Sequence, residues 1–335
     1  MLPIPDCCPG HLEPGHTTYC PRCKAALFGS RTAKISHLLP FPPPNKDAAY
    51  GKLFQENQQH ISISGVQEKY SLGLIKNKLE LVDRNGHYIL KPIPGNLLNR
   101  EFIPANEHLT MQLAKQVFGI ETAVNALIFF NDGTPAYLTK RFDYKPDGTK
   151  YQVEDFATLL GKTEEMEGPN FKYNASYEDI GLTIKKYIPA TAVALEKFFT
   201  LVVFNYLFSN GDAHLKNFSA IESPDGDYIL APAYDLMCTR LHIDDNDIGL
   251  QEGLYEEDLE SASFQKFGVY TYENFIELGV KIGIPTRRSA KIIEQLLKKI
   301  PDVGPLVQRS FLSEELKIQY MEHLREKERR FKLMP

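Results

Sequence analysis

The feature that most constrains the fold is an apolar run, AVALEKFFTLVVFNYLF (192–208), which the polar stretch SNGDAHLKNFS (209–219) follows at once. The run is apolar on most sides of a helical projection, which predicts a helix buried in a core. A buried helix holds the loop after it rigidly, as a functional site requires. A plain turn does not need so many Asn, Asp, His and Lys side chains, so the stretch is a candidate site.

The bulk composition is that of a soluble globular protein. The chain has 335 residues, 43% hydrophobic and 24% charged, which suits one large domain or two ordinary ones. A net charge of −5 argues against a nucleic-acid footprint over the whole surface and leaves room for a local basic patch. The sequence has no apolar run of membrane-spanning length, and its start, MLPIPDCCPG, does not resemble a signal peptide. We therefore expect a cytoplasmic protein that neither enters a membrane nor binds nucleic acid strongly.

Three zones follow one another along the chain. Residues 1–45 are rich in Cys, Pro and Gly and end in the linker-like LLPFPPPNK. Residues 46–143 predict a β-rich lobe with hairpins at RNG and NDG, and a helix over ANEHLTMQLAKQVFGI that stops at Gly119. Residues 144–335 are mostly helical, with two short strands, FSAI and YILAPAYD. The predicted architecture is α+β, with a small β-rich lobe, a larger helical lobe and a cleft between them.

The polar stretch carries the spacing of a kinase catalytic loop. Asp212 and Asn217 are five residues apart, and Asp235 follows after a predicted hairpin. Phosphoryl transfer from ATP needs a carboxylate near the attacking hydroxyl and an Asn and an Asp that hold Mg²⁺, in this order along the chain. The alternative is a polar loop whose Asn, Gly and Asp only form a turn. His214 completes D-x-H-x-x-N, which also marks small-molecule kinases of the aminoglycoside and choline type, and it serves at least to hold the loop.

A kinase also needs a lysine on a small-lobe strand and a glutamate on the small-lobe helix. Lys91 ends the strand-like HYILKP, and Glu107 lies in NEHLTMQLAK. Lys91 would hold ATP phosphates, and the alternative is an exposed lysine at a strand end. Glu107 would pair with it, and the alternative is a charge favoured at a helix start.

The segment ISISGVQEKYSLGL (61–74) precedes that lysine, where a phosphate-cradling turn is expected. It has a single glycine before Lys69 and not the G-x-G-x-x-G of ordinary protein kinases. Its backbone N–H groups and Lys69 are nevertheless suited to phosphate. Ser62 and Ser64 place hydroxyls where a γ-phosphate is expected, and the alternative is an ordinary serine-containing hairpin.

Four of the five cysteines crowd into CCPGHLEPGHTTYCPRC. Cys8-x-x-His11 and Cys20-x-x-Cys23 match the paired knuckles of tetrahedral Zn²⁺ sites, and Cys7 and His16 are substitutes for the same positions. The alternative is a redox-silent strap that packs on the small lobe.

Seven motifs occur together in one order: SISGVQEK, YILKP, NEH, KRFDY, VEDFATLLG, NGDAHLKNFS and PAYDL. In this combination the chain resembles the HipA-like serine/threonine kinase toxins over about residues 50–330. Full-length members carry a further N-terminal subdomain of roughly a hundred residues. The chain is too short for it and is expected to be of the shorter HipT type.

The resemblance implies a bilobal, kinase-like fold and an ATP- and Mg²⁺-dependent enzyme. Asp212 would be the catalytic base, Asn217 and Asp235 the Mg²⁺ ligands, and Lys140–Phe142 the hinge against the adenine. Ser62 and Ser64 would be autophosphorylated, which in the family switches the enzyme off. The implied ATP-binding residues are Ser64, Gly65, Val66, Gln67, Lys69, Lys91, Glu107, Lys140, Arg141, Phe142, His214 and Lys216.

The resemblance also implies partners. The protein substrate would be a translation protein such as an aminoacyl-tRNA synthetase, and the expected partners are a HipB-like DNA-binding antitoxin and a separate small HipS-like subunit. The sequence departs from eukaryotic kinases because YDLMC lacks Phe-Gly after the metal Asp, so their activation-loop switching is not expected. Two alternatives stay open: a small-molecule kinase, and a non-catalytic repressor subunit that binds the antitoxin.

Overall fold

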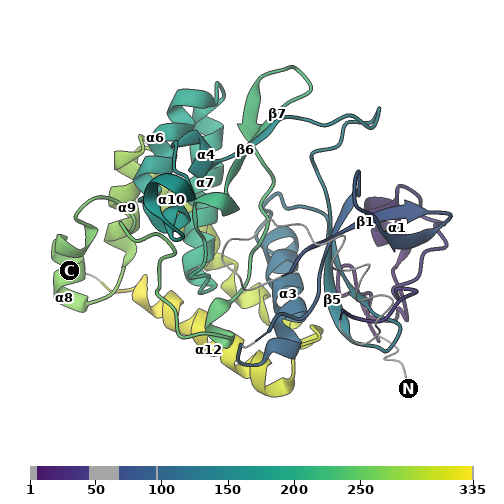
Figure 1. The fold of residues 1–335 in the computed structure, drawn as a ribbon. Helices are drawn as coiled ribbons and strands as arrows, with labels where there is room; N and C mark the ends of the chain where they lie inside the picture. The colour runs from purple at the N-terminus through teal and green to yellow at the C-terminus, as the bar shows by residue number, and fades with distance from the viewer. Residues whose placement is uncertain (1–5, 45–67, 96, 334–335) are drawn as a thin grey trace.

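The structure is a computed structural model that describes residues 6–44, 68–95 and 97–333. It confirms the predicted α+β class: an antiparallel sheet with one long helix forms a small lobe, and a larger, mostly helical lobe lies beside it (Figure 1). The predictions for Ser62, Ser64, Gly65, Val66 and Gln67 concern residues outside the described ranges.

The small lobe, or N-lobe, is built on a five-stranded antiparallel sheet. Its strand order is β2-β1-β3-β5-β4. Along each strand, successive side chains face opposite sides of the sheet. One face buries a cluster that includes Leu72, Leu90 and Leu138. The strands are β1 (Tyr70–Ile75), β2 (Lys78–Leu81), β3 (Tyr88–Lys91), β4 (Asn125–Phe129) and β5 (Pro135–Lys140).

The predicted hairpin at RNG is wrong. The tight turn lies earlier, at Lys76 and Asn77, whose φ angles of 47° and 63° suit the left-handed turns that connect adjacent antiparallel strands. After β2 the chain passes through RNG and crosses to the other side of β1, where β3 pairs. The predicted hairpin around NDG is confirmed by the pairing of β4 with β5.

Helix α3 (Ile103–Gln116) covers the second face of the sheet and is buried over most of its length (Figure 1). Pro104 occupies its first turn, where a missing N–H costs nothing, and Gly119 ends it with a φ of 71°. The helix also reaches the other lobe, because Asn106 Nδ2 donates to Cys238 O at 2.8 Å and Thr110 contacts the Tyr320 hydroxyl at 2.9 Å. Both lobes therefore position α3.

The N-terminal segment, residues 6–44 with helix α1 (Pro21–Phe28), packs against the sheet as a strap. Leu39 N donates to Phe129 O at 2.7 Å, so the segment covers the edge of β4. The Tyr88 hydroxyl on β3 donates to Leu27 O at 2.8 Å. The segment is thus attached to both β3 and β4.

The larger lobe, or C-lobe, is built around α7 (Thr191–Leu207), the predicted buried helix. A three-stranded sheet, β6-β7-β8, lies on the side of α7 nearest the N-lobe. Among the described residues, every helix is too short or too polar to cross a bilayer. The remaining elements are β6 (Val153–Asp155), α4 (Phe156–Leu159), α5 (Glu164–Glu167), α6 (Tyr177–Tyr187), β7 (Ser219–Glu222), β8 (Tyr228–Leu230), α8 (Ala262–Phe267), α9 (Tyr272–Lys281), α10 (Thr286–Lys298), α11 (Gly304–Gln308) and α12 (Glu314–Arg330).

Candidate active site

The loop after α7 is held tightly by the backbone around it. Asn210 N donates to Asn205 O at 2.9 Å, which folds the loop back onto the helix. Gly211 N donates to the Thr239 hydroxyl at 2.9 Å. A Cβ at Gly211 would lie 2.3 Å from Asn246 O, so only glycine fits there. The polar side chains that follow are therefore presented from a rigid support.

The β7–β8 hairpin returns the chain to this loop and sets Asp235 beside it. Ala233 N donates to Glu121 O, and Ala123 N donates to Ala233 O, so this segment pairs with the one that leads into β4. Asp235 has a φ of 56°, a left-handed conformation that is unfavourable for a residue with a side chain. Such conformations concentrate at functional sites, where the surrounding structure enforces them.

Four of the predicted residues form one charge cluster. Lys91 Nζ lies 2.6 Å from Glu107 Oε1, and it also donates to Asp235 Oδ1. Lys91 and Glu107 each expose only 4% of their side chains. Lys69 Nζ lies 3.4 Å from Asp235 Oδ2. Two cations and two carboxylates thus meet where β3, α3 and the β8 loop converge.

The pKa values follow from this burial and pairing. Burial raises the pKa of Glu107 to about 7, against the opposing effect of Lys91. Burial acts to raise the pKa of Asp235, but Lys69 and Lys91 hold that pKa well below its usual range. Burial acts to lower the pKa of Lys91, but the two carboxylates raise it above its usual value. Lys91 and Asp235 are therefore charged at neutral pH.

Asn217 lies next to Asp235, from the 3₁₀ turn Leu215–Asn217. Its Nδ2 is 3.4 Å from Asp235 Oδ2, and its Oδ1 accepts from His214 N at 3.0 Å. A carbonyl oxygen has a second lone pair, so Oδ1 can keep the His214 contact and still ligate a cation. The pair supplies the oxygen donors that Mg²⁺ prefers.

Asp212 lies at the open end of the same loop and is exposed. The Tyr173 hydroxyl donates to Asp212 Oδ1 at 2.7 Å, which fixes the orientation of the carboxylate. Sequence reasoning missed Tyr173, because it lies in a 3₁₀ turn 39 residues upstream with no motif around it.

His214 points away from solvent and contacts Lys172. Its Nε2 accepts from Lys172 Nζ at 2.8 Å, and burial lowers its pKa to about 4, so the ring is neutral. Its Nδ1 finds no hydrogen-bond partner within the described part of the chain. Sequence reasoning also missed Lys172, which is 4% exposed, and burial lowers the pKa of its ammonium.

The remaining predicted residues lie around the same space. Lys216 Nζ pairs with Asp155 Oδ2 at 2.6 Å, and Arg141 pairs with Asp143 at 2.6 Å. The Phe142 ring lies 5.9 Å from the Tyr234 ring, and Lys140 Nζ donates to Ala26 O at 3.4 Å. In the predicted hinge, Lys140 and Arg141 therefore contact other groups of the protein, and the Phe142 ring lies beside the cavity.

A cavity of about 660 Å³ joins these side chains, within the usual range for small-molecule sites. Its wall combines the charge cluster with apolar side chains such as Ile89, Ile103 and Met237. Every residue predicted for the kinase site that the structure describes lines it: Lys69, Lys91, Glu107, Lys140, Arg141, Phe142, Asp212, His214, Lys216, Asn217 and Asp235. The structure brings these residues together, and their roles stay predictions.

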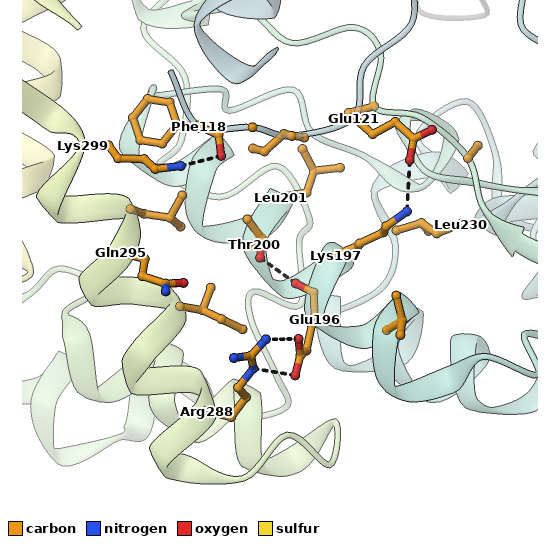
Figure 2. A pocket seen from close by; sticks show the side chains of 17 residues that line it. Phe118, Glu121, Glu196, Lys197, Thr200, Leu201, Leu230, Arg288, Gln295 and Lys299 are labelled. Carbon is orange, nitrogen blue, oxygen red and sulfur yellow. Dashed lines mark hydrogen bonds and ion pairs between the residues drawn. The ribbon is translucent and has the colours of Figure 1, made fainter. Parts of the chain in front are cut away.

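A second cavity, of about 420 Å³, lies on the C-lobe between α7 and α10 (Figure 2). Its charged side chains face one another. Arg288 forms two hydrogen bonds with Glu196, and Lys197 pairs with Glu121 at 3.0 Å. We place the candidate active site in the larger cavity, because the residues predicted for the kinase site line that cavity.

The cysteine-rich segment brings together the four residues of the predicted zinc site. The ligand atoms of Cys8, His11, Cys20 and Cys23 all lie within 4.8 Å of one another. The two substitutes are elsewhere: Cys7 Sγ donates to Arg309 O at 3.3 Å, and His16 contacts Glu13 at 3.4 Å. None of the four clustered residues is among those that line the larger cavity.

Comparisons with known proteins agree with this geometry. Residues 61–303 match the family model of the HipA-like C-terminal domain. A relative named "Putative kinase" from Haemophilus influenzae is 28% identical over 272 residues, 77% of this chain and 78% of the relative. "Putative kinase Y4dM" from Sinorhizobium fredii is 30% identical over 267 residues, 73% of this chain but only 61% of that relative.

Two solved structures share the fold. HipA from the Shewanella oneidensis toxin–antitoxin complex with HipB and operator DNA superposes with a TM-score of 0.63 at 19% identity, over 82% of this chain and 65% of HipA. The Helicobacter pylori proinflammatory kinase CtkA superposes with a TM-score of 0.50 at 14% identity, over 79% of this chain and 90% of CtkA. With the family model covering more than half of its residues, the chain belongs to the family of proteins with a HipA-like C-terminal domain.

Proposed function

We propose that the protein is an ATP-dependent serine/threonine protein kinase. The observation that carries the proposal is the meeting of Lys91, Glu107 and Asp235 on one wall of the cavity, with Asn217 and Asp212 along the same loop. This is the set of groups that phosphoryl transfer requires: a lysine held by a glutamate, two metal ligands and a carboxylate at the acceptor position. The names of the relatives support the kinase class.

ATP would lie with its base toward the apolar end of the cavity, near Phe142 and Ile89, and its phosphates toward Lys91 and Lys69. Asn217 and Asp235 fit a Mg²⁺ ion because they lie side by side and carry the oxygen ligands that Mg²⁺ prefers. Lys69 and Lys91 beside them would attract the phosphates. Bound Mg²⁺ would supply charge neutralisation for the phosphates. Lys91 donates to Asp235 Oδ1, so a Mg²⁺ ion on Asp235 would compete with Lys91 for this carboxylate.

Asp212 would orient the acceptor hydroxyl and take its proton. Its carboxylate is exposed at the mouth of the cavity, where an acceptor can approach, and Tyr173 holds it in one orientation. Lys172 and Lys216 add positive charge along the same wall, which favours the developing charge on the transferred phosphoryl group. The neutral His214 supports the loop and is not needed for proton transfer.

The finer assignments rest on the motifs and on the family. We propose that Ser62 or Ser64 is autophosphorylated, that the protein acts as a toxin on a translation protein such as an aminoacyl-tRNA synthetase, and that a HipB-like antitoxin is its partner. The Shewanella HipA structure, which contains HipB and operator DNA, supports the partnership. A HipS-like subunit is part of the same proposal.

The test is incubation of the purified protein with γ-labelled ATP, Mg²⁺ and a cell lysate, followed by identification of the labelled protein. We expect label on one lysate protein and on a peptide with Ser62 or Ser64, and no transfer by Asp212→Asn. Unmodified serines together with turnover of a small alcohol would instead establish a small-molecule kinase, the class that shares D-x-H-x-x-N.

A further inference from the structure

We propose that Cys8, His11, Cys20 and Cys23 bind one Zn²⁺ ion, and that the loops around this zinc knuckle position the helix that carries Glu107. The metal site stands on its own geometry. Its effect on nucleotide binding rests on the proposed kinase function.

The four side chains lie close enough together for a tetrahedral site, with all ligand atoms within 4.8 Å of one another. His11 Nδ1 lies 3.2 Å from Cys23 Sγ and 3.6 Å from Cys20 Sγ. Ligands about 2.0–2.3 Å from a zinc ion at tetrahedral angles stand roughly 3.3–3.8 Å from each other. The three cysteines are buried and His11 is nearly so. A set of three sulfurs and one imidazole is typical of structural zinc sites, which have no open position.

The groups behind the ligands are also those of a metal site. His11 Nε2 lies 3.1 Å from Glu13 Oε2, which leaves Nδ1 for the metal, as in carboxylate–histidine–zinc arrangements. Backbone N–H groups of Gly10 and Cys20 donate to Cys8 Sγ at 3.4 and 3.2 Å, and such donors favour a thiolate. A Cβ at residue 10 would lie 2.5 Å from Cys23 Sγ, so the knuckle needs glycine there.

The buried cluster around the ligands is small. It consists of the three cysteines, Tyr19, Leu27 and, from β4, Ala126. A core of this size is too small to stabilise an isolated module, and a metal is a common remedy.

The knuckle contacts α3 directly beside Glu107. His108 Nε2 lies 3.1 Å from Gly10 O, and His108 is buried. At the last residue of the helix, Gln116 Nε2 donates to His11 O at 3.0 Å. The knuckle backbone thus accepts hydrogen bonds from both halves of α3.

The same segment contacts the sheet near Lys91. Leu127 N on β4 donates to Pro9 O at 2.8 Å, and the Tyr88 hydroxyl, three residues before Lys91, donates to Leu27 O at 2.8 Å. Strand β3, which carries Lys91, and helix α3, which carries Glu107, therefore both contact the segment that holds the knuckle. Without the metal, these carbonyl groups would no longer be held in place. The Lys91 and Glu107 side chains would then be positioned less exactly relative to each other.

The first experiment measures metal in the full-length protein purified without added zinc. Elemental analysis should find one zinc per chain, lost in Cys8→Ser and Cys20→Ser. The matched controls are Cys7→Ser and His16→Gln, which change a neighbouring cysteine and histidine outside the cluster and should keep the zinc. A protein without zinc, zinc lost equally in the controls, or a disulfide between Cys20 and Cys23 would each overturn the metal site.

The second experiment tests the coupling. Zinc is removed with a zinc-selective chelator in excess Mg²⁺, and Mg-ATP binding is measured by titration. We expect at least a severalfold weaker affinity, restored when zinc is returned. Equal affinity with and without zinc would refute the coupling. If the zinc-loaded wild type binds no ATP, the proposed function fails and the metal site stands.

His108 gives an independent test as a positioning residue. His108→Leu should keep its zinc but weaken Mg-ATP binding, because it removes the bond to Gly10 O. His108→Gln keeps a donor and should restore affinity. Gln116→Ala serves as a milder variant if His108→Leu does not fold. Unchanged affinity in folded, zinc-loaded His108→Leu and Gln116→Ala would contradict the positioning role.

Discussion

Lys91 and Asp235 contact each other on one wall of the cavity although 144 residues separate them in the chain. The ammonium of Lys91 donates to Asp235 while it pairs with Glu107 at 2.6 Å. One side chain therefore joins a strand, a helix and the loop after β8. Changes at this contact should affect the stability of the protein as well as its activity.

Replacing Lys91 with Met should abolish ATP binding and destabilise the protein. The change leaves Glu107 and Asp235 as neighbouring carboxylates with one cation fewer, and breaking a buried pair costs up to about 3–5 kcal/mol. Glu107, whose pKa burial already raises to about 7, relieves part of this by taking a proton. The measurement is urea unfolding together with a titration of Mg-ATP.

Lys69→Met is the matched control, because Lys69 contacts the same carboxylate at 3.4 Å and exposes 19% of its side chain. We expect a smaller loss of stability there, at most about 1 kcal/mol. Equal losses of stability in Lys91→Met and Lys69→Met would show that the buried contacts of Lys91 contribute no more to stability than the contact of Lys69.

Asp212→Asn should keep ATP binding and lose at least about a hundredfold in phosphoryl transfer, since an amide cannot accept the proton. Tyr173→Phe should lose less, because it removes only the hydroxyl that orients the carboxylate. Single-turnover rates with labelled ATP separate the two effects from binding. Normal transfer by Asp212→Asn would remove Asp212 from the chemistry.

Mg²⁺ should be required for most of the stabilisation by ATP. Ligand at a hundred times its dissociation constant stabilises a protein by about 2.7 kcal/mol, and the phosphates bind well only when a metal offsets the charge of Asp235. Thermal unfolding with Mg-ATP should give a larger shift than ATP with chelator, and Asp235→Asn should remove the difference. A scan with chelator alone corrects for any other metal in the protein. Equal shifts would contradict the metal role of Asn217 and Asp235.

Much of the fold could be predicted because local patterns and tertiary structure agree. The apolar run became α7, and Gly119 stopped α3 where its freedom at positive φ is needed. The hairpin at RNG was predicted wrongly because RNG is a good turn sequence whichever strands it connects. Strand order depends on packing over the whole sheet, which a local motif does not encode.

The candidate site shows the same limit. Asp212, Asn217 and Asp235 could be found because their spacing is a motif. Tyr173 and Lys172 could not, because they act through contacts made by a separate turn of the chain. The contact of His108 with Gly10 is likewise visible only in three dimensions, since 98 residues separate the two.

Stability should depend on pH through Asp245, which contacts Thr239 beside the loop that carries Asp212. Burial raises the pKa of Asp245 to about 6 from the usual value of 3.8 for this carboxyl. Between these values the folded chain keeps a proton that the unfolded chain has lost, so this group's contribution to stability falls as pH rises and is constant above about pH 6. Asp245→Asn should reduce that fall by at most about 3 kcal/mol.

The measurement is the free energy of unfolding in urea across this pH range, for wild type, Asp245→Asn and Asp244→Asn. Asp244 is the control because 97% of its side chain is exposed. An unchanged pH profile in Asp245→Asn would show that Asp245 is ionised throughout.

Asp247 should contribute more to stability than the exposed Asp244, because its ion pairs connect α12 to the loop that follows the candidate site. It accepts from Lys327 and Arg330 on α12 and from Arg240 at 3.2 Å. Lys327 is only 1% exposed, and burial lowers its pKa to about 8. Asp247→Ala leaves this buried ammonium without its carboxylate, at a cost of about 3–5 kcal/mol near neutral pH.

The pH dependence of Asp247→Ala distinguishes this cause from simple loss of packing. Without Asp247 the pKa of Lys327 falls further, so the unfolded chain holds a proton that the folded chain lacks, and stability recovers as pH rises toward the normal pKa of lysine. Asp244→Ala, which removes only an exposed partner of Arg240, should cost less than about 1 kcal/mol. Urea unfolding of both variants at neutral and alkaline pH checks this. If the loss of stability in Asp247→Ala does not shrink at alkaline pH, then the packing of Asp247, and not its charge, holds α12 in place.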